Sequence, residues 1–121
     1  MTKRILVVED QEDSRQIIRD TLAVTGYEIV EATNGEEALA AVAKQRPDLI
    51  LMDIQLPIMD GYTATRQIRI DPALRSVPII AVTSYALSEE KEKARAAGCN
   101  DYVPKPFSPR ELLAKIRNFL E

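Results

Sequence analysis

Five short apolar segments recur along the chain, and stretches of helical periodicity separate them. They run from Ile5 to Val8, Ile29 to Ala32, Leu49 to Met52, Ile79 to Val82 and Tyr102 to Val103. Strands that are buried on both faces read as continuous apolar runs, and their alternation with helices is typical of a covered parallel sheet. The pattern therefore predicts an α/β fold of five βα units.

Capping residues mark where two of the helices begin. Ser108, Pro109 and Glu111 suit the N-cap and first turn of the last helix. Asn34 and Glu37 repeat this pattern for an earlier helix. We expect the last helix to pack firmly on the sheet through an apolar stripe made of Leu112, Leu113, Ile116, Phe119 and Leu120.

The first helix has a less distinct pattern. Ile17, Ile18 and Leu22 are the apolar residues expected to face the core, and Gly26 is the expected end of the helix.

The fourth helix, expected from Ser88 to Ala97 with Gly98 as its C-cap, is rich in charged residues. These leave mainly Ala94 and Ala97 to bury. Because alanines bury little surface, the helix suits a moving element, and a plain solvated helix fits the sequence equally well.

Composition narrows the classes of protein that fit. The length of 121 residues suits one domain, and we expect residues 1–121 to form it without an output domain. Charged residues make up 29% of the chain and the net charge is −3, which favours neither nucleic acid nor an anionic membrane as a partner. No long apolar run or basic leader occurs, so the expected location is the cytoplasm, without membrane insertion.

The chain contains no histidine and one cysteine, Cys99. Ser/His and Cys/His nucleophile systems are therefore excluded, as are an intrachain disulfide and a zinc site of the usual ligands. Any phosphate that arrives through a histidine must come from a partner's histidine. Cys99 is expected to serve as a small packing residue after Gly98.

Polar side chains follow four of the five predicted strands. The first strand ends in Glu9 and Asp10, the third in Asp53, the fourth in Thr83 and the fifth in Lys105. The carboxyl ends of parallel strands share one edge of the sheet, and ligands bind there where the strand order reverses. We therefore expect these side chains to meet in one crevice.

Three carboxylates in one crevice repel one another unless a cation offsets their charge. Mg²⁺ fits this role because it prefers hard oxygen ligands and retains several waters. Asp10 and Asp53 are the candidates for direct ligands, Gln55 would supply its main-chain carbonyl, and Glu9 would bind directly or through water.

Asp53 is then the candidate nucleophile for a phosphoryl group, with an aspartyl phosphate as the product. The metal would reduce the repulsion between carboxylate and phosphate, while Lys105 and Thr83 would donate to the remaining oxygens. Each residue alone has an ordinary explanation, such as a helix cap, a turn hydroxyl or a surface lysine. The prediction of a phosphorylation site rests on their occurrence together, in this order, at the ends of four different strands.

Four segments carry a family resemblance: VVED, DLILMDIQLPIMDG, PIIAVTSYA and DYVPKPF. With them, the chain resembles from end to end the receiver domain of two-component response regulators. The resemblance implies a flavodoxin-like, doubly wound (βα)5 fold with strand order 2-1-3-4-5. It also implies a signalling switch that takes a phosphoryl group from a histidine kinase or histidine phosphotransfer protein and changes the binding of a downstream target.

The resemblance assigns roles to individual residues. Asp53 is implied as the phosphoacceptor, Thr83 as the switch hydroxyl and Lys105 as the phosphate-binding lysine, followed by a cis peptide before Pro106. Glu9, Asp10, Asp53 and the Gln55 carbonyl are implied as the Mg²⁺ site. Tyr102 occupies the position of an aromatic that turns inward on activation, and a half-buried strand tyrosine is equally compatible with the sequence.

Two further sets of residues surround this site. Gln55 and Tyr85 lie two positions beyond Asp53 and Thr83, where they would flank an attacking water and set the rate of hydrolysis. By analogy with the family, a kinase would dock near Gln11, Ser14, Arg15, Pro106 and Phe107, although the first of these segments also suits an ordinary amphipathic helix.

Two other classes of protein compete with this interpretation. A haloacid-dehalogenase-like phosphatase would need an acid two positions after its nucleophile, and Gln55 cannot protonate a leaving group. A phosphorylation-independent adaptor would use the same fold without the chemistry. Dinucleotide binding is disfavoured because no GxGxxG follows the first strand.

Overall fold

The computed structural model describes residues 2–84 and 88–121. Its sheet has five parallel strands in the order β2-β1-β3-β4-β5, as the family resemblance implied. The strands are β1 (Arg4–Val8), β2 (Glu28–Ala32), β3 (Leu49–Asp53), β4 (Ile79–Thr83) and β5 (Asp101–Pro104). The predicted apolar runs form these strands.

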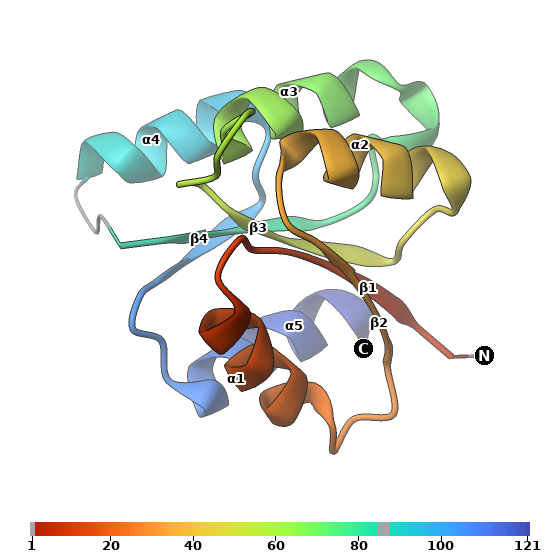
Figure 1. Cartoon of the computed structure of the whole chain (residues 1–121), viewed down its shortest axis with the longest axis vertical. Coiled ribbons are helices and arrows are strands. Elements are labelled where there is room, and N and C mark those ends of the chain that lie inside the picture. The colour runs from red at the N-terminus through yellow and green to blue at the C-terminus, as the bar shows by residue number, and fades with distance from the viewer. Residues whose placement is uncertain (1, 85–87) are drawn as a thin grey trace.

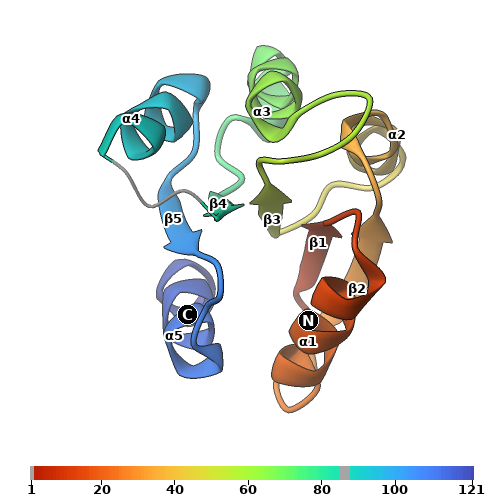
Figure 2. The same cartoon turned by 60° about the vertical axis from the view of Figure 1, so that its left-hand side comes forward.

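Helices cover both faces of the sheet. Helices α1 (Glu12–Leu22) and α5 (Pro109–Leu120) lie on one face, and α2 (Gly35–Lys44), α3 (Gly61–Ile70) and α4 (Ser88–Ala97) on the other (Figure 1). A short 3-10 helix, Pro72–Leu74, precedes β4. Figure 2 shows the same two layers from a second direction. The doubly wound arrangement is therefore confirmed.

The two helix layers bury two separate core clusters. Alternate residues of a strand point to opposite faces, so Ile5 and Val7 pack toward α1 and α5 while Leu6 and Val8 pack toward α2 and α3. Two of the interior strands, β3 and β4, are buried along their whole length. Their carboxyl ends are therefore anchored from both faces.

The predicted caps are present. The Asn34 side chain accepts from the Glu37 amide at 2.9 Å, and the Ser108 hydroxyl accepts from the Glu111 amide at 3.4 Å. After α4, Gly98 has a φ of 116°, and the amides of Gly98 and Cys99 bond to carbonyls in the last turn. This is a Schellman motif, which confirms Gly98 as the predicted C-cap.

Two expectations for the first helix are wrong. Ile17 is 51% exposed, because neighbouring helical residues point about 100° apart and the core stripe takes only Ile18 and Leu22. The helix ends at Leu22 rather than at Gly26, since the Thr25 amide and hydroxyl both bond to the Leu22 carbonyl. Gly26, with a φ of 80°, lies in the turn that follows.

The start of α3 lies directly against the end of β3. A Cβ added at Gly61 would fall 2.3 Å from the Asp53 carbonyl oxygen and 2.8 Å from the Ile54 Cα. The Gly61 amide donates to the Ile54 carbonyl at 3.0 Å, which closes the loop between β3 and α3. The Asp60 side chain caps α3 by accepting from the Thr63 amide at 3.0 Å. Close packing at Gly61 therefore fixes the backbone that carries Asp53.

Within residues 2–84 and 88–121, each helix is too short or too polar to span a lipid bilayer.

Candidate functional site

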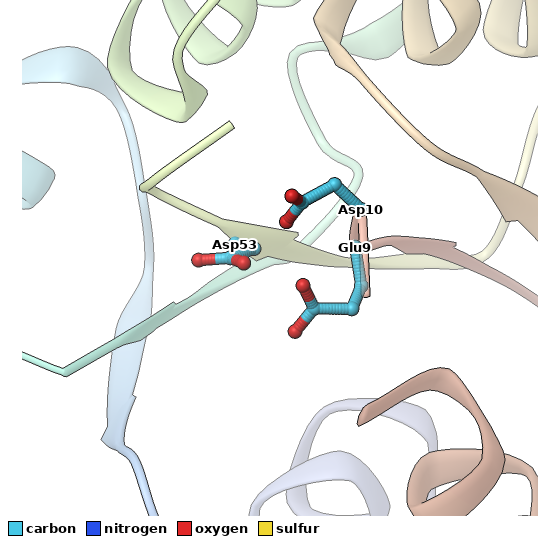
Figure 3. Close-up of side chains that lie close together, drawn as sticks. All are labelled: Glu9, Asp10 and Asp53. Carbon is cyan, nitrogen blue, oxygen red and sulfur yellow. The ribbon is translucent and has the colours of Figure 1, made fainter. Parts of the chain in front are cut away.

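Three carboxylates gather at the carboxyl end of the sheet. Glu9 and Asp10 follow β1, and Asp53 ends β3, the neighbouring strand. One oxygen from each lies within 4.8 Å of the others. In Figure 3 the carboxylates of Glu9 and Asp10 lean toward the strand that carries Asp53. The structure thus brings together the acids that the sequence placed at separate strand ends.

Glu9 is almost completely buried, with 1% of its surface exposed. Its amide donates to the Ala32 carbonyl of β2 at 3.0 Å. Its side chain accepts from the Gln11 amide at 3.3 Å and from Lys105 at 2.5 Å. This carboxylate is therefore held in one orientation.

Lys105 lies at the centre of the site. Its Nζ is 2.5 Å from Glu9 Oε1 and 3.0 Å from Asp53 Oδ2. The lysine follows β5, where its amide donates to the Thr83 carbonyl at 2.7 Å. The peptide between Lys105 and Pro106 is cis, as the resemblance implied. One ammonium group thus bridges two of the three carboxylates.

Burial and the proximity of like charges make the ionised carboxylates of this site less favourable. Burial raises the pKa of Glu9, and the nearby Asp53 carboxylate raises it further, which together outweigh the opposite effect of Lys105. Burial and the Glu9 carboxylate also raise the pKa of Asp10. Burial opposes the charge of Lys105, yet its bonds to Glu9 and Asp53 raise its pKa overall. A further cation would therefore be stabilised here.

Gln55 connects the strand ends of β3 and β4. Its amide donates to Asp53 Oδ1 at 3.1 Å, and its side-chain Nε2 donates to the Thr83 hydroxyl at 3.2 Å. Its Oε1 accepts from the Ser84 amide at 3.4 Å. Thr83 itself is buried, with 2% exposed. The sequence did not predict this link, because it depends on the side-chain conformation of Gln55.

Tyr102 lies on β5, beside α4. The ring is partly buried against the core cluster under α2, α3 and α4. Lys91 of α4 places its Nζ 4.9 Å from the ring centroid, within cation–π range. Tyr85 lies outside the described residues.

The residues proposed for kinase docking divide into two groups. Ser14, Pro106 and Phe107 line one pocket of about 290 Å³, together with Ile17 and Lys105. Gln11 is exposed nearby, at the start of α1. Arg15 differs, because its side chain is only 13% exposed and is engaged with Glu9, Glu12 and Glu31.

Comparison with known proteins gives the family. The family model of the response regulator receiver domain matches residues 5–117. The polar-differentiation response regulator DivK of Brucella anthropi is 41% identical over 120 residues, which cover 99% of this chain and 98% of that protein. The chain belongs to the response regulator receiver domain family.

Solved structures agree with this assignment. The chemotaxis response regulator CheY4 of Vibrio cholerae superposes with a TM-score of 0.93 at 32% identity, covering 98% of this chain and 99% of that one. The receiver domain of the sensor histidine kinase PA1611 of Pseudomonas aeruginosa superposes with a TM-score of 0.91 at 40% identity, covering 98% of each chain. That structure has a magnesium ion coordinated in its active site cleft.

Membership of this family defines the broad function. Receiver domains are phosphorylation-dependent switches in two-component signalling, and they act with histidine kinases and downstream targets rather than as turnover enzymes. A haloacid-dehalogenase-like phosphatase is thereby excluded. These proteins bind Mg²⁺ at an acidic pocket, and the carboxylate cluster fits such a site.

The Glu9→Gln substitution tests the charge balance of the metal-free site. Because folding raises the pKa of Glu9 above its ordinary value of 4.5, the ionised carboxylate destabilises the folded protein above that raised pKa. The effect disappears as the pH falls below 4.5. Glu9→Gln should therefore raise the free energy of unfolding in a chelator near neutral pH, with a gain that shrinks on acidification.

The measurement is urea unfolding between about pH 4 and pH 8, the range in which carboxylates of raised pKa titrate. Glu36→Gln is the control, since Glu36 is exposed on α2. A Glu9 variant less stable than the wild type throughout this range would show that Lys105 already balances the charge.

Proposed function

We propose that this receiver domain accepts a phosphoryl group on Asp53 from a phosphohistidine of a histidine kinase or histidine phosphotransfer protein. The observation that carries the proposal is the position of Lys105, whose Nζ lies 3.0 Å from Asp53 Oδ2. Asp53 is also within reach of two further carboxylates that suit a divalent cation. A carboxylate with a fixed ammonium neighbour and a cation site is equipped to receive an anionic group.

The donor set favours Mg²⁺. Glu9, Asp10 and Asp53 would contribute carboxylate oxygens and Gln55 its main-chain carbonyl, with waters completing the octahedron. The pKa values of Glu9 and Asp10 are raised by burial first and then by the neighbouring carboxylate, and a bound cation would oppose both effects. Bound Mg²⁺ would supply charge neutralisation between Asp53 and the incoming phosphate.

The proposed transfer proceeds by in-line displacement. A carboxylate oxygen of Asp53 attacks phosphorus, the bond from phosphorus to the imidazole nitrogen of the partner breaks, and its electron pair stays on that nitrogen. Lys105 and the Thr83 hydroxyl donate to oxygens of the transferred group. The chain thereby promotes its own phosphorylation and later loss of the phosphoryl group, without turnover of an external substrate.

The proposed signal begins at Thr83. The new acceptor oxygens on Asp53 would attract the Thr83 hydroxyl as a donor. This would draw it from its present position, in which its oxygen accepts from Gln55 Nε2 at 3.2 Å. Movement of Thr83 would free space for Tyr102 to turn inward, away from Lys91. To shift the ratio of active to inactive conformations from 1:99 to 99:1, phosphorylation must stabilise the active one by about 5.5 kcal/mol more than the inactive one. A few charge-assisted hydrogen bonds supply this difference. The output surface would then be α4, β5 and α5.

The proposed kinase surface surrounds the crevice. It comprises Gln11, Ser14, Pro106 and Phe107, with Ile17 added by its exposure in the same pocket. Arg15, which the sequence placed in this surface, is mostly turned toward its ion pairs.

Phe107→Ala should slow transfer from a phosphorylated histidine phosphotransfer protein while leaving labelling by acetyl phosphate unchanged.

The proposal is tested by intact mass after incubation with acetyl phosphate and Mg²⁺. The wild type should gain one phosphoryl group, and Asp53→Asn should gain none, because an amide is not a nucleophile for this transfer. A chelator should also abolish the gain. Asp101→Asn is a matched control, since Asp101 lies at the start of β5 and pairs with Lys115 instead.

Equal labelling of wild type and Asp53→Asn would contradict the assignment of the phosphoacceptor. If no labelling occurs and beryllofluoride does not bind either, a phosphorylation-independent adaptor becomes the better explanation. Target binding that is unaffected by Asp53→Asn would lead to the same conclusion.

We also propose that Gln55 and Tyr85 set the lifetime of the phosphoryl group. A bulky ring at position 85 would exclude the attacking water, so Tyr85→Ala should speed the loss of mass after acetyl phosphate is removed. Tyr85→Phe keeps the ring and should lose its phosphoryl group at the wild-type rate. Equal decay in Tyr85→Ala and the wild type would refute this role.

A further inference from the structure

The guanidinium of Arg15 extends from α1 to the end of β1. Its Nη1 donates to the main-chain carbonyl of Glu9 at 2.8 Å. Its Nε lies 3.0 Å from Glu31 on β2, and its Nη2 pairs with Glu12. All three nitrogens of the guanidinium therefore have partners within the domain, so the side chain is not free to bind another protein.

The Arg15 bond completes the support of the Glu9 backbone. On the other side, the Glu9 amide donates to the Ala32 carbonyl at 3.0 Å. Because the peptide group is planar, fixing the Glu9 carbonyl also fixes the amide of Asp10 and the direction in which the Asp10 chain continues. Arg15 thus holds the peptide that joins two of the three clustered carboxylates.

Arg19 provides a natural comparison within the same group of charges. It pairs with Glu31 at 2.9 Å and with Glu12, the two acids that Arg15 also contacts. Within the described part of the chain, no hydrogen bond links Arg19 to Glu9. The two arginines therefore share their ion pairs and differ in the bond to the site backbone.

We propose that Arg15 is a positioning residue for the Mg²⁺ site, acting through the Glu9–Asp10 peptide. The inference rests on the proposed function, since it assumes that these carboxylates bind the metal. Residues that orient metal ligands typically change metal affinity by 10–100-fold when they are removed. Arg15 itself would touch neither the metal nor the phosphoryl group.

Loss of the Arg15 charge and loss of its positioning role should change the Mg²⁺ affinity in opposite directions. Removing a positive charge near a cation site strengthens cation binding, because like charges repel. Loss of positioning weakens binding, because Asp10 and Glu9 must then be ordered by the metal. The sign of the change in Mg²⁺ affinity therefore separates the two explanations.

The experiment is calorimetric titration of the full chain with Mg²⁺. Arg15→Gln should raise the dissociation constant about 10-fold. Arg19→Gln should leave the dissociation constant unchanged or lower it slightly. Arg15→Lys should have a dissociation constant between those of Arg15→Gln and the wild type, because lysine keeps a hydrogen-bond donor but lacks the planar set of donors of a guanidinium. Urea unfolding in a chelator reports the stability of each variant separately.

Arg15→Gln with affinity equal to or above that of the wild type would overturn the inference. Equal weakening in Arg15→Gln and Arg19→Gln would overturn it too, because the shared ion pairs would then be responsible. If Arg15→Gln does not fold, an Arg15→Lys variant with wild-type affinity serves as the contradicting result. A wild type that binds no Mg²⁺ would refute the proposed metal site as well.

Discussion

The repulsion among Glu9, Asp10 and Asp53 is the interaction around which the site is organised. Two unit charges 4 Å apart cost about 4 kcal/mol at the effective dielectric of a protein surface. Lys105 offsets part of this by contacting Glu9 and Asp53. Burial, and after it the neighbouring carboxylate, still raises the pKa values of Glu9 and Asp10. The folded protein thus holds stored electrostatic energy that a cation can release, and destabilised sites of this kind are common where function requires them.

Such crowding requires a rigid frame. The carboxylates are held because β1 and β3 are central strands with helices on both faces, and because α3 starts in contact with the Asp53 backbone at Gly61. By contrast, α4 buries mainly Ala94 and Ala97. It is tied to α3 by the Tyr62 hydroxyl, which donates to Glu90 at 2.7 Å. The strands that carry the carboxylates are thus firmly anchored, whereas α4 is anchored more weakly. This difference suits a switch in which the site stays fixed while the output surface changes.

The sequence predicted the features that depend on residue order. The apolar runs, the caps at Asn34 and Ser108 and the acids at two strand ends follow from local pattern and from the geometry of parallel sheets. Features that depend on helix rotation or side-chain conformation were missed. The exposure of Ile17, the inward turn of Arg15 and the contact from Gln55 to Thr83 all belong to this group, because periodicity does not specify which rotamer a long side chain adopts.

The carboxylate cluster is proposed to be a Mg²⁺ site in which a bound cation offsets the repulsion that Lys105 leaves in place. The most direct test is the free energy of unfolding in urea as a function of Mg²⁺ concentration. Mg²⁺ should stabilise the fold by an amount that grows with the logarithm of its concentration, reaching about 2.7 kcal/mol at 100 times the dissociation constant. Asp10→Asn should lose this stabilisation. Unfolding curves for the wild type that coincide with and without Mg²⁺ would contradict the proposed Mg²⁺ site.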